Sequence, residues 1–113
     1  MHQFDLKNRT AIITGGAQGF GFDIAKRFLD SGSKVIIWDI DKDELLQASK
    51  KLNNTNLSYN IVDVSDHEQV KNTVAEITKK SNIDILINNA GITGSTNSLW
   101  NYDVTEWNKI INI

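Results

Sequence analysis

Short apolar runs and amphipathic stretches alternate along the whole chain. Four runs rich in Ile, Val and Leu predict buried β-strands at residues 10–14, 34–39, 57–62 and 83–87. Between them, apolar residues recur at helical spacing, which predicts three helices; Ile24, Ala25, Phe28 and Leu29 line one face of the first. A fourth helix is expected after Asp103, and the end of the chain cuts it short.

Polar residues and glycine mark the expected helix ends. Gly32 stands where a glycine commonly terminates a helix. Asp41 with Glu44, and Ser65 with Glu68, have the spacing of capping pairs and predict the starts of the second and third helices.

This order of elements defines a fold class. Strands that are apolar almost throughout, each followed by a helix, indicate an α/β protein whose parallel sheet is covered on both faces. Right-handed connections favour a doubly wound, Rossmann-like sheet of order 3-2-1-4. Residues 1–113 then form one domain, truncated after the fourth strand and the start of the next helix.

Composition narrows the classes of function. With 40% hydrophobic and 23% charged residues, the chain resembles an ordinary globular domain. A net charge of −2 gives no field for nucleic acid, and no apolar run is long enough to span a membrane. The absence of cysteine, with His2 and His67 as the only histidines, argues against a thiolate or multi-histidine metal site. We expect no metal, and a cytoplasmic protein that takes a small-molecule substrate.

The strongest candidate site is the glycine-rich segment between the first strand and the first helix. Gly15, Gly19 and Gly21 are spaced G-x-x-x-G-x-G, where backbone N–H groups at a helix start can hold a pyrophosphate. The alternative is a tight turn with incidental glycines.

Asp39 strengthens the first interpretation. It ends the second strand, close to the ~20-residue spacing at which dinucleotide folds place an acid for the adenosine ribose hydroxyls. A solvated strand-end aspartate is the alternative. The adjacent Trp38 is expected to pack at the sheet edge or beside the adenine.

Three motifs at the ends of the first, third and fourth strands resemble those of the short-chain dehydrogenase/reductase family. They are Thr14-Gly15-x-x-x-Gly19-x-Gly21, Asp63-Val64 and Asn88-Asn89-Ala90-Gly91. The resemblance runs from about Lys7 to Ile113 and implies the family's N-terminal, cofactor-binding portion.

The resemblance also implies which residues contact the cofactor. Gln18, Gly19 and Phe20 would lie along the pyrophosphate, Asp63 would receive the adenine amino group, and residues 89–91 would line the nicotinamide-side ribose. The expected cofactor-binding residues are Gly15, Gln18, Gly19, Phe20, Gly21, Asp39, Ile40, Asp63, Val64, Asn89, Ala90 and Gly91.

The expected cofactor is NAD, with NADP less favoured. NADP-using members of the family commonly carry a basic residue before the middle glycine, where this chain has Gln18. The charge of Asp39 would in addition repel a 2′-phosphate.

The family's catalytic Ser and Tyr-x-x-x-Lys group is not found here. Neither Tyr59 nor Tyr102 is followed by a lysine at that spacing, and the family's helix asparagine would fall just past Ile113, so Asn112 is expected to be an ordinary helix residue. No catalytic residue is therefore assigned. The chain alone is expected to be inactive, and the full-length form to be a homo-oligomer, as is usual in the family.

The expected function is an NAD-dependent oxidoreductase that transfers a hydride between the nicotinamide and a secondary alcohol or carbonyl, of the sugar/polyol or 3-oxoacyl type. The alternative is a non-catalytic dinucleotide-binding module or a truncated pseudoenzyme. A methyltransferase also places glycines and an acid after its first two strands, but the segment at residues 88–91 argues against it.

Overall fold

The computed structural model describes residues 7–89 of the chain, in which strands and helices alternate. The strands are β1 (Thr10–Thr14), β2 (Lys34–Asp39), β3 (Leu57–Ile61) and β4 (Ile85–Asn88). The helices are α1 (Gly19–Asp30), α2 (Lys42–Leu52) and α3 (His67–Thr78). The helix expected after Asp103 lies outside the described residues.

All four strands are parallel and lie in the order β3-β2-β1-β4, which confirms the predicted fold class. Ile13 in the centre of β1 is in register with Ile37 of β2 and Ile87 of β4. Within the described part of the chain, β1 and β2 are interior strands, whereas β3 and β4 are the two outermost strands of the sheet. Because the strands are parallel, their carboxyl ends meet at one edge.

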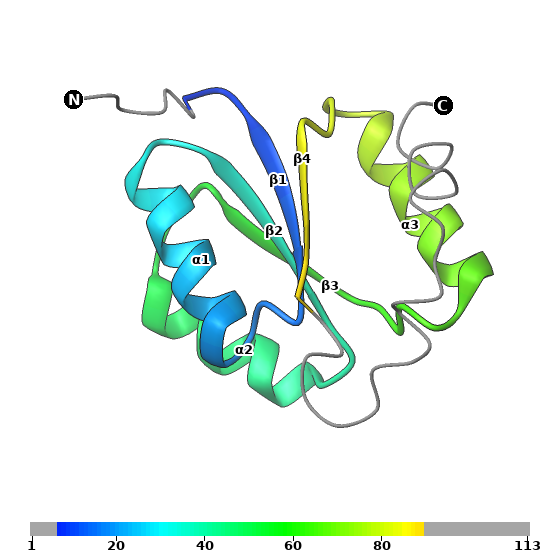
Figure 1. Cartoon of the computed structure of the whole chain (residues 1–113), viewed down its shortest axis with the longest axis horizontal. Helices are drawn as coiled ribbons and strands as arrows, with labels where there is room; N and C mark the ends of the chain where they lie inside the picture. Colours follow the sequence, from blue (N-terminus) through cyan, green and yellow to red (C-terminus); the bar gives the residue numbers. More distant parts are fainter. Residues whose placement is uncertain (1–6, 90–113) are drawn as a thin grey trace.

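The sheet is covered on both faces. Figure 1 shows α1 and α2 on one side of the strands and α3 on the other. Side chains alternate along each strand, so neighbouring residues enter different layers. The layer under α1 and α2 contains Ile13, Ala17, Ala25, Leu29, Val35, Ile37, Leu45 and Ala48. The layer under α3 contains Ile12, Ile36, Trp38, Val62, Val70 and Val74.

Trp38 differs from its predicted position. Its side chain is fully buried, and its indole Nε1 donates to Oδ1 of Asn60 on β3 at 3.2 Å. The prediction of a sheet-edge or adenine-side residue is wrong because β2 is an interior strand. Strand alternation places Trp38 with Ile36 in the layer under α3, away from solvent.

The carboxyl end of α1 forms the glycine motif that the sequence predicts. Gly32 has φ 88° and its N–H donates to the Leu29 carbonyl at 3.0 Å. The N–H of Ser33 donates to the Phe28 carbonyl at 3.0 Å. This pair of bonds is a Schellman motif, which needs a residue tolerant of positive φ at the position of Gly32.

One of the two predicted capping residues is confirmed. Asp41 begins α2 and its Oδ1 accepts from the N–H groups of Asp43 at 3.0 Å and Glu44 at 3.2 Å. The cap of α3 is Asp66 rather than Ser65. Ser65 instead donates both its N–H and its hydroxyl to the carboxylate of Asp63.

Two strand boundaries also differ slightly from the prediction. β3 ends at Ile61, one residue before the predicted end, and β4 spans Ile85–Asn88 instead of residues 83–87. At the start of β4, the carboxylate of Asp84 accepts the N–H of Thr10 at 2.9 Å, in the place of a backbone carbonyl. Asp84 also donates its own N–H to the Thr10 carbonyl at 2.9 Å, and the paired residues of β1 and β4 begin at Ala11 and Ile85.

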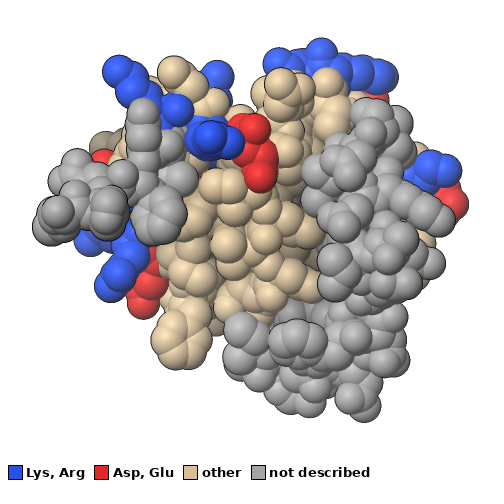
Figure 2. Space-filling model, turned by 45° about the horizontal axis from the view of Figure 1, so that its top comes forward, with Lys and Arg blue, Asp and Glu red and all other residues tan. Residues whose placement is uncertain are grey.

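Basic side chains gather where the helices end. The last turns of α1 and α2 carry Arg27, Lys50 and Lys51, where cations stabilise the helix dipole. Figure 2, with the amino ends of the strands turned forward, shows two groups of Lys and Arg at the upper left and upper right, with other residues between them. No described helix is long and apolar enough to cross a membrane.

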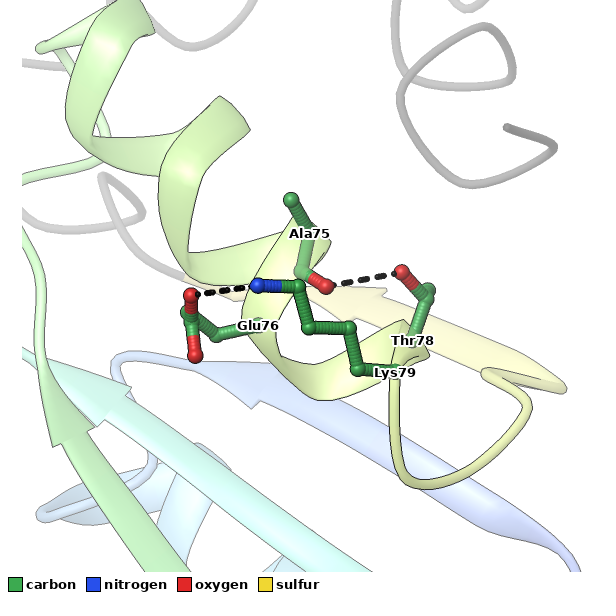
Figure 3. A network of polar contacts seen from close by, with 4 residues as sticks. All are labelled: Ala75, Glu76, Thr78 and Lys79. Atoms are coloured by element: carbon green, nitrogen blue, oxygen red, sulfur yellow. Dashed lines mark hydrogen bonds and ion pairs between the residues drawn. The ribbon is translucent and has the colours of Figure 1, made fainter.

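The carboxyl end of α3 carries an exposed ion pair (Figure 3). Lys79 Nζ lies 3.1 Å from Oε1 of Glu76, and their side chains are 70% and 71% exposed. The hydroxyl of Thr78 donates to the Ala75 carbonyl at 3.1 Å. At this exposure the ion pair adds little to stability.

Candidate dinucleotide site

The glycine turn lies between β1 and α1 and rests on the end of β2. The N–H of Gly15 donates to the Trp38 carbonyl at 2.7 Å, and the N–H of Gly16 lies 3.4 Å from the same oxygen. Gly15 and Gly19 have φ values of 64° and 58°, which glycine adopts without steric cost. A Cβ on Gly16 would lie 2.6 Å from Cγ2 of Ile37, so this glycine, which the sequence analysis left out, allows the turn to pack on β2.

Asn89 joins the end of β4 to the same turn. Its backbone N–H donates to Oγ1 of Thr14 at 2.9 Å, and its Nδ2 donates to the Gly15 carbonyl at 3.2 Å. The Thr14 hydroxyl in turn donates to Oδ1 of Asn88 at 3.0 Å. A Cβ on Gly21 would overlap the Gly15 carbonyl and lie 2.7 Å from Asn89 Nδ2. Gly21 therefore allows α1 to start against the turn and Asn89.

The start of α1 differs from the starts of α2 and α3. Gln18 occupies the cap position, but its side chain makes no capping hydrogen bond, and the first turn of α1 contains no acidic residue. In contrast, the side chains of Asp41 and Asp66 cap α2 and α3, and both helices carry acids in their first turns. Among residues 7–89, α1 is thus the helix whose first N–H groups lack a carboxylate partner. Such a helix start favours an anion from outside.

Asp39 stands at the carboxyl end of β2, at the same edge of the sheet as the glycine turn. Its side chain is half-buried, and Oδ1 accepts from the N–H of Asp41 at 3.2 Å. Oδ2 has no hydrogen-bond partner among residues 7–89 and can accept from a ligand. Two large apolar side chains at this edge are well exposed: Phe20 at 72% and Ile40 at 67%.

Asp63 lies just after β3 in a turn held by Ser65. Its Oδ1 accepts from the Ser65 hydroxyl at 2.6 Å and from the Ser65 N–H at 2.9 Å. These bonds, the hydroxyl above all, hold the pKa of Asp63 below its ordinary value of 3.8, although partial burial opposes them. The carboxylate is therefore charged at neutral pH. The next residue, Val64, packs against the apolar layer under α3.

The fold thus brings most of the predicted residues to one edge of the sheet. They follow the carboxyl ends of β1, β2, β3 and β4 in turn. Ala90 and Gly91 lie outside the described residues, as do Tyr102 and Asn112. Tyr59 lies within β3 and packs against the layer under α1 and α2, as expected of a strand side chain. Within residues 7–89, no three acidic or histidine side chains gather as a metal site.

Three further residues support this edge through hydrogen bonds that the sequence analysis did not foresee. Thr14 is part of the glycine motif, but the sequence predicts no role for it. Its hydroxyl donates a hydrogen bond to the side chain of Asn88. Gln69 accepts the N–H of Asp63 at 2.8 Å. The spacing of Asp66 and Gln69 is itself a capping signal, D-x-x-Q, which overlaps the pair Ser65 and Glu68 that was predicted instead.

Comparisons with known proteins agree with this geometry. A family model described as short chain dehydrogenase matches residues 9–113. The 3-oxoacyl-[acyl-carrier-protein] reductase of Chlamydia trachomatis serovar D is 39% identical over 111 residues, which cover 95% of this chain and 44% of the relative. The 2-dehydro-3-deoxy-L-rhamnonate dehydrogenase (NAD(+)) of a Sphingomonas strain is 38% identical over 109 residues, covering 93% and 42%.

Solved structures share the fold. The 2-keto-3-deoxy-D-gluconate dehydrogenase from Streptococcus agalactiae superposes with a TM-score of 0.71 at 32% identity, covering 97% of this chain and 42% of that one. The chain thus spans less than half the length of these relatives. With the family model matching nearly all of its residues, this chain belongs to the short-chain dehydrogenase family of oxidoreductases.

Proposed function

We propose that this chain binds NAD along the carboxyl edge of its sheet and forms the dinucleotide-binding part of a short-chain dehydrogenase. The observation that carries this proposal is the start of α1, which has neither a capping side chain nor an acid in its first turn. It follows a turn in which glycines permit both the positive φ values and the close approach of Asn89. These features suit a pyrophosphate, whose oxygens can accept from the free N–H groups.

Each remaining part of the cofactor has a candidate partner at the same edge. Oδ2 of Asp39 can accept from the adenosine ribose hydroxyls, and the charged Asp63 can accept from the adenine amino group. Phe20 and Ile40 offer exposed apolar surface beside these polar groups. Asn89 orients the glycine turn from the side of β4, and with Ala90 and Gly91 it would line the nicotinamide-side ribose.

The nicotinamide of the bound cofactor would exchange a hydride with the carbon of a secondary alcohol or carbonyl. The described residues of this chain bind and orient the dinucleotide, and no proton transfer is assigned to them. The names of these relatives favour a sugar-acid or 3-oxoacyl substrate, and a polyol is the further candidate from the family resemblance. The resemblance also favours a homo-oligomer of the complete protein.

A dinucleotide-binding module without turnover is the second candidate. It would account for a chain whose 113 residues contain no Tyr-x-x-x-Lys pair. The purified chain, mixed with NAD and a secondary alcohol, is expected to form no NADH. A coding frame that continued without that pair would favour the binding module, and one that contained it would favour the dehydrogenase.

Calorimetric titration of the purified chain with NAD and with NADP tests the binding site. We expect NAD to bind more tightly, by tenfold or more, because a carboxylate beside a 2′-phosphate is a like-charge contact. Asp39→Asn should remove most of this preference. Asp43→Asn is the matched control, since it removes one negative charge from the first turn of α2 without touching Asp39. Equal binding of the two cofactors by the unmodified chain would contradict the role of Asp39.

A further inference from the structure

The side chain of Gln69 returns from α3 to the end of β3. Its Oε1 accepts from the N–H of Asp63 at 2.8 Å, and its Nε2 donates to the Ile61 carbonyl at 3.2 Å. Its own backbone is held within α3, where its N–H donates to Asp66 Oδ1 at 3.2 Å and its carbonyl accepts from the Thr73 hydroxyl at 2.7 Å. The amide group is therefore presented from a fixed helical position.

These two bonds repeat the pattern of a parallel β-ladder. In such a ladder one residue donates its N–H to the carbonyl of one residue and accepts, at its own carbonyl, from the N–H of the residue two positions later. The Gln69 amide does this with Ile61 and Asp63, on either side of Val62. It thus continues the pairing of β3 for one step beyond the last strand residue, on the side of the sheet where no described strand follows.

The other side of the same segment is held by β2. The N–H of Val62 donates to the carbonyl of Asp39 at 3.0 Å, and the Val62 side chain is 2% exposed. The N–H of Val62 is thus bound to Asp39, whereas the Ile61 carbonyl and the Asp63 N–H on either side of it are bound to the Gln69 amide. The two carboxylates proposed to contact the adenosine half of the cofactor are connected through this segment.

The two oxygens of the Asp63 carboxylate differ in their hydrogen bonding. Ser65 occupies its Oδ1 with two hydrogen bonds, which leaves Oδ2 without a partner among the described residues. The N–H that fixes the backbone of Asp63 is bound by Gln69 alone. Ser65 therefore sets the side-chain rotamer, and Gln69 sets the position of the backbone that carries it.

We propose that Gln69 is a positioning residue for adenine recognition: by extending the pairing of β3, its amide holds Asp63 where Oδ2 can accept the 6-amino group of the dinucleotide. This role presupposes the NAD binding proposed above. It predicts that Gln69 affects how well the site distinguishes adenine from a base that lacks the amino group. A side chain that served only the stability of α3 would not change that discrimination.

The experiment compares the binding of NAD and of nicotinamide hypoxanthine dinucleotide, in which an oxygen replaces the 6-amino group. The unmodified 113-residue chain is expected to prefer NAD by about tenfold, as one lost hydrogen bond to a charged acceptor predicts. Gln69→Met keeps the length of the side chain and removes both hydrogen bonds, and should bring the ratio of the two dissociation constants close to one. Gln47→Met is the control, since Gln47 is exposed on α2 and the same exchange there should leave the ratio unchanged.

Amide hydrogen exchange by NMR on the free chain supplies a second measurement. In Gln69→Met the amide of Asp63 should exchange about tenfold faster or more, whereas that of Val62, which is bound to Asp39, should change much less. Gln69→Ala is measured alongside, because its smaller side chain cannot overfill the site.

The outcomes separate the two proposals. If the unmodified chain binds no NAD, the proposed function fails and the role of Gln69 fails with it. If it binds and prefers NAD but the folded variants keep the same ratio, or lose both ligands equally, only the positioning role is overturned. Failure of both variants to fold in the cold would likewise overturn it, because Gln69 would then be a residue of general stability.

Discussion

Two turns at the carboxyl edge of the sheet are held in different ways. The glycine turn after β1 is bound by groups distant in sequence: the Trp38 carbonyl and the side chain of Asn89. The turn after β3 is bound mostly by its own neighbours, since Ser65 and Gln69 satisfy Asp63. The glycine turn follows β1, which pairs with both β2 and β4. The turn after β3 follows a strand that, among the described strands, pairs with β2 alone.

The position of each strand explains the difference. A turn that leaves an interior strand has neighbours on both sides, and close packing there requires residues without a Cβ. A turn that leaves an outer strand has open space on one side, so polar side chains of the following helix satisfy its backbone groups. Variants of the first turn should therefore affect stability most, and variants of the second should have smaller effects that depend on pH.

The largest effect is expected for Gly21→Ala. The new methyl group would overlap the Gly15 carbonyl, a backbone atom that cannot rotate away. We expect a loss of about 2 kcal/mol in the free energy of unfolding, because this clash exceeds the ~1 kcal/mol that alanine gains over glycine in a helix. Urea denaturation followed by circular dichroism measures it.

Gly19→Ala is the matched comparison for that variant. A Cβ at Gly19 meets no atom within 4 Å, but φ is 58°, which costs an alanine about 1 kcal/mol. The new methyl would lie in the open space offered to the pyrophosphate, so NAD binding should weaken by more than the stability loss suggests. A larger loss of stability in Gly19→Ala than in Gly21→Ala would contradict this account of the turn.

Asn89→Ala should destabilise the chain by about 1 kcal/mol, because the Gly15 carbonyl loses its hydrogen bond from Nδ2. The backbone bond from Asn89 to Thr14 remains, so the fold should persist. Thermal unfolding of the variant and of Asn72→Ala, an exposed position on α3, provides the measurement and its control. Equal melting temperatures in the two variants would show that β4 does not secure the turn.

Ser65→Ala should have a smaller effect, below about 1 kcal/mol, and one that depends on pH. The Ser65 hydrogen bonds lower the pKa of Asp63 in the folded state, so their stabilisation is present above the unfolded value and lost as pH falls through the folded one. The gap in stability between the unmodified chain and the variant should be full at pH 6 and shrink as the pH drops below 3.8.

Urea denaturation at pH 6 and in acid, with Ser58→Ala on the exposed surface of β3 as control, measures that gap. NMR titration should also show the pKa of Asp63 rising toward its ordinary value in Ser65→Ala. A gap that stayed constant across the pH range would disprove the link to Asp63.

The smallest effect is expected for Lys79→Met, below about 0.5 kcal/mol. Its partner Glu76 is as exposed as Lys79 itself, so solvent screens the pair. Chemical denaturation at low and high salt measures the change in the free energy of unfolding. This change is the reference against which the effects of the variants in the two turns are compared. A loss comparable to that of Asn89→Ala would mean that surface charge, and not the packing of the turns, dominates stability here.

Much of the fold could be predicted because its signals are local. Continuous apolar strands and helical periodicity indicate a covered parallel sheet, and Gly32 and Asp41 act within a few residues of their own positions. The cap of α3 was predicted one residue too early because two capping patterns overlap in the sequence. The hydrogen bond from the N–H of Gln69 to Oδ1 of Asp66 shows which of the two is used.

The alternation of apolar strands with helices, present in the sequence by itself, determined the fold class and the strand order. The glycines, the acids at the ends of β2 and β3 and the asparagines at the end of β4 indicated the family and the candidate site. The tertiary structure alone decided how these pieces contact one another. It buried Trp38 beneath α3, pressed Gly21 against the Gly15 carbonyl and Asn89, and brought Gln69 back to Asp63. Such contacts join residues that are far apart in the sequence, and they depend on the packing of side chains between elements, which no local pattern contains.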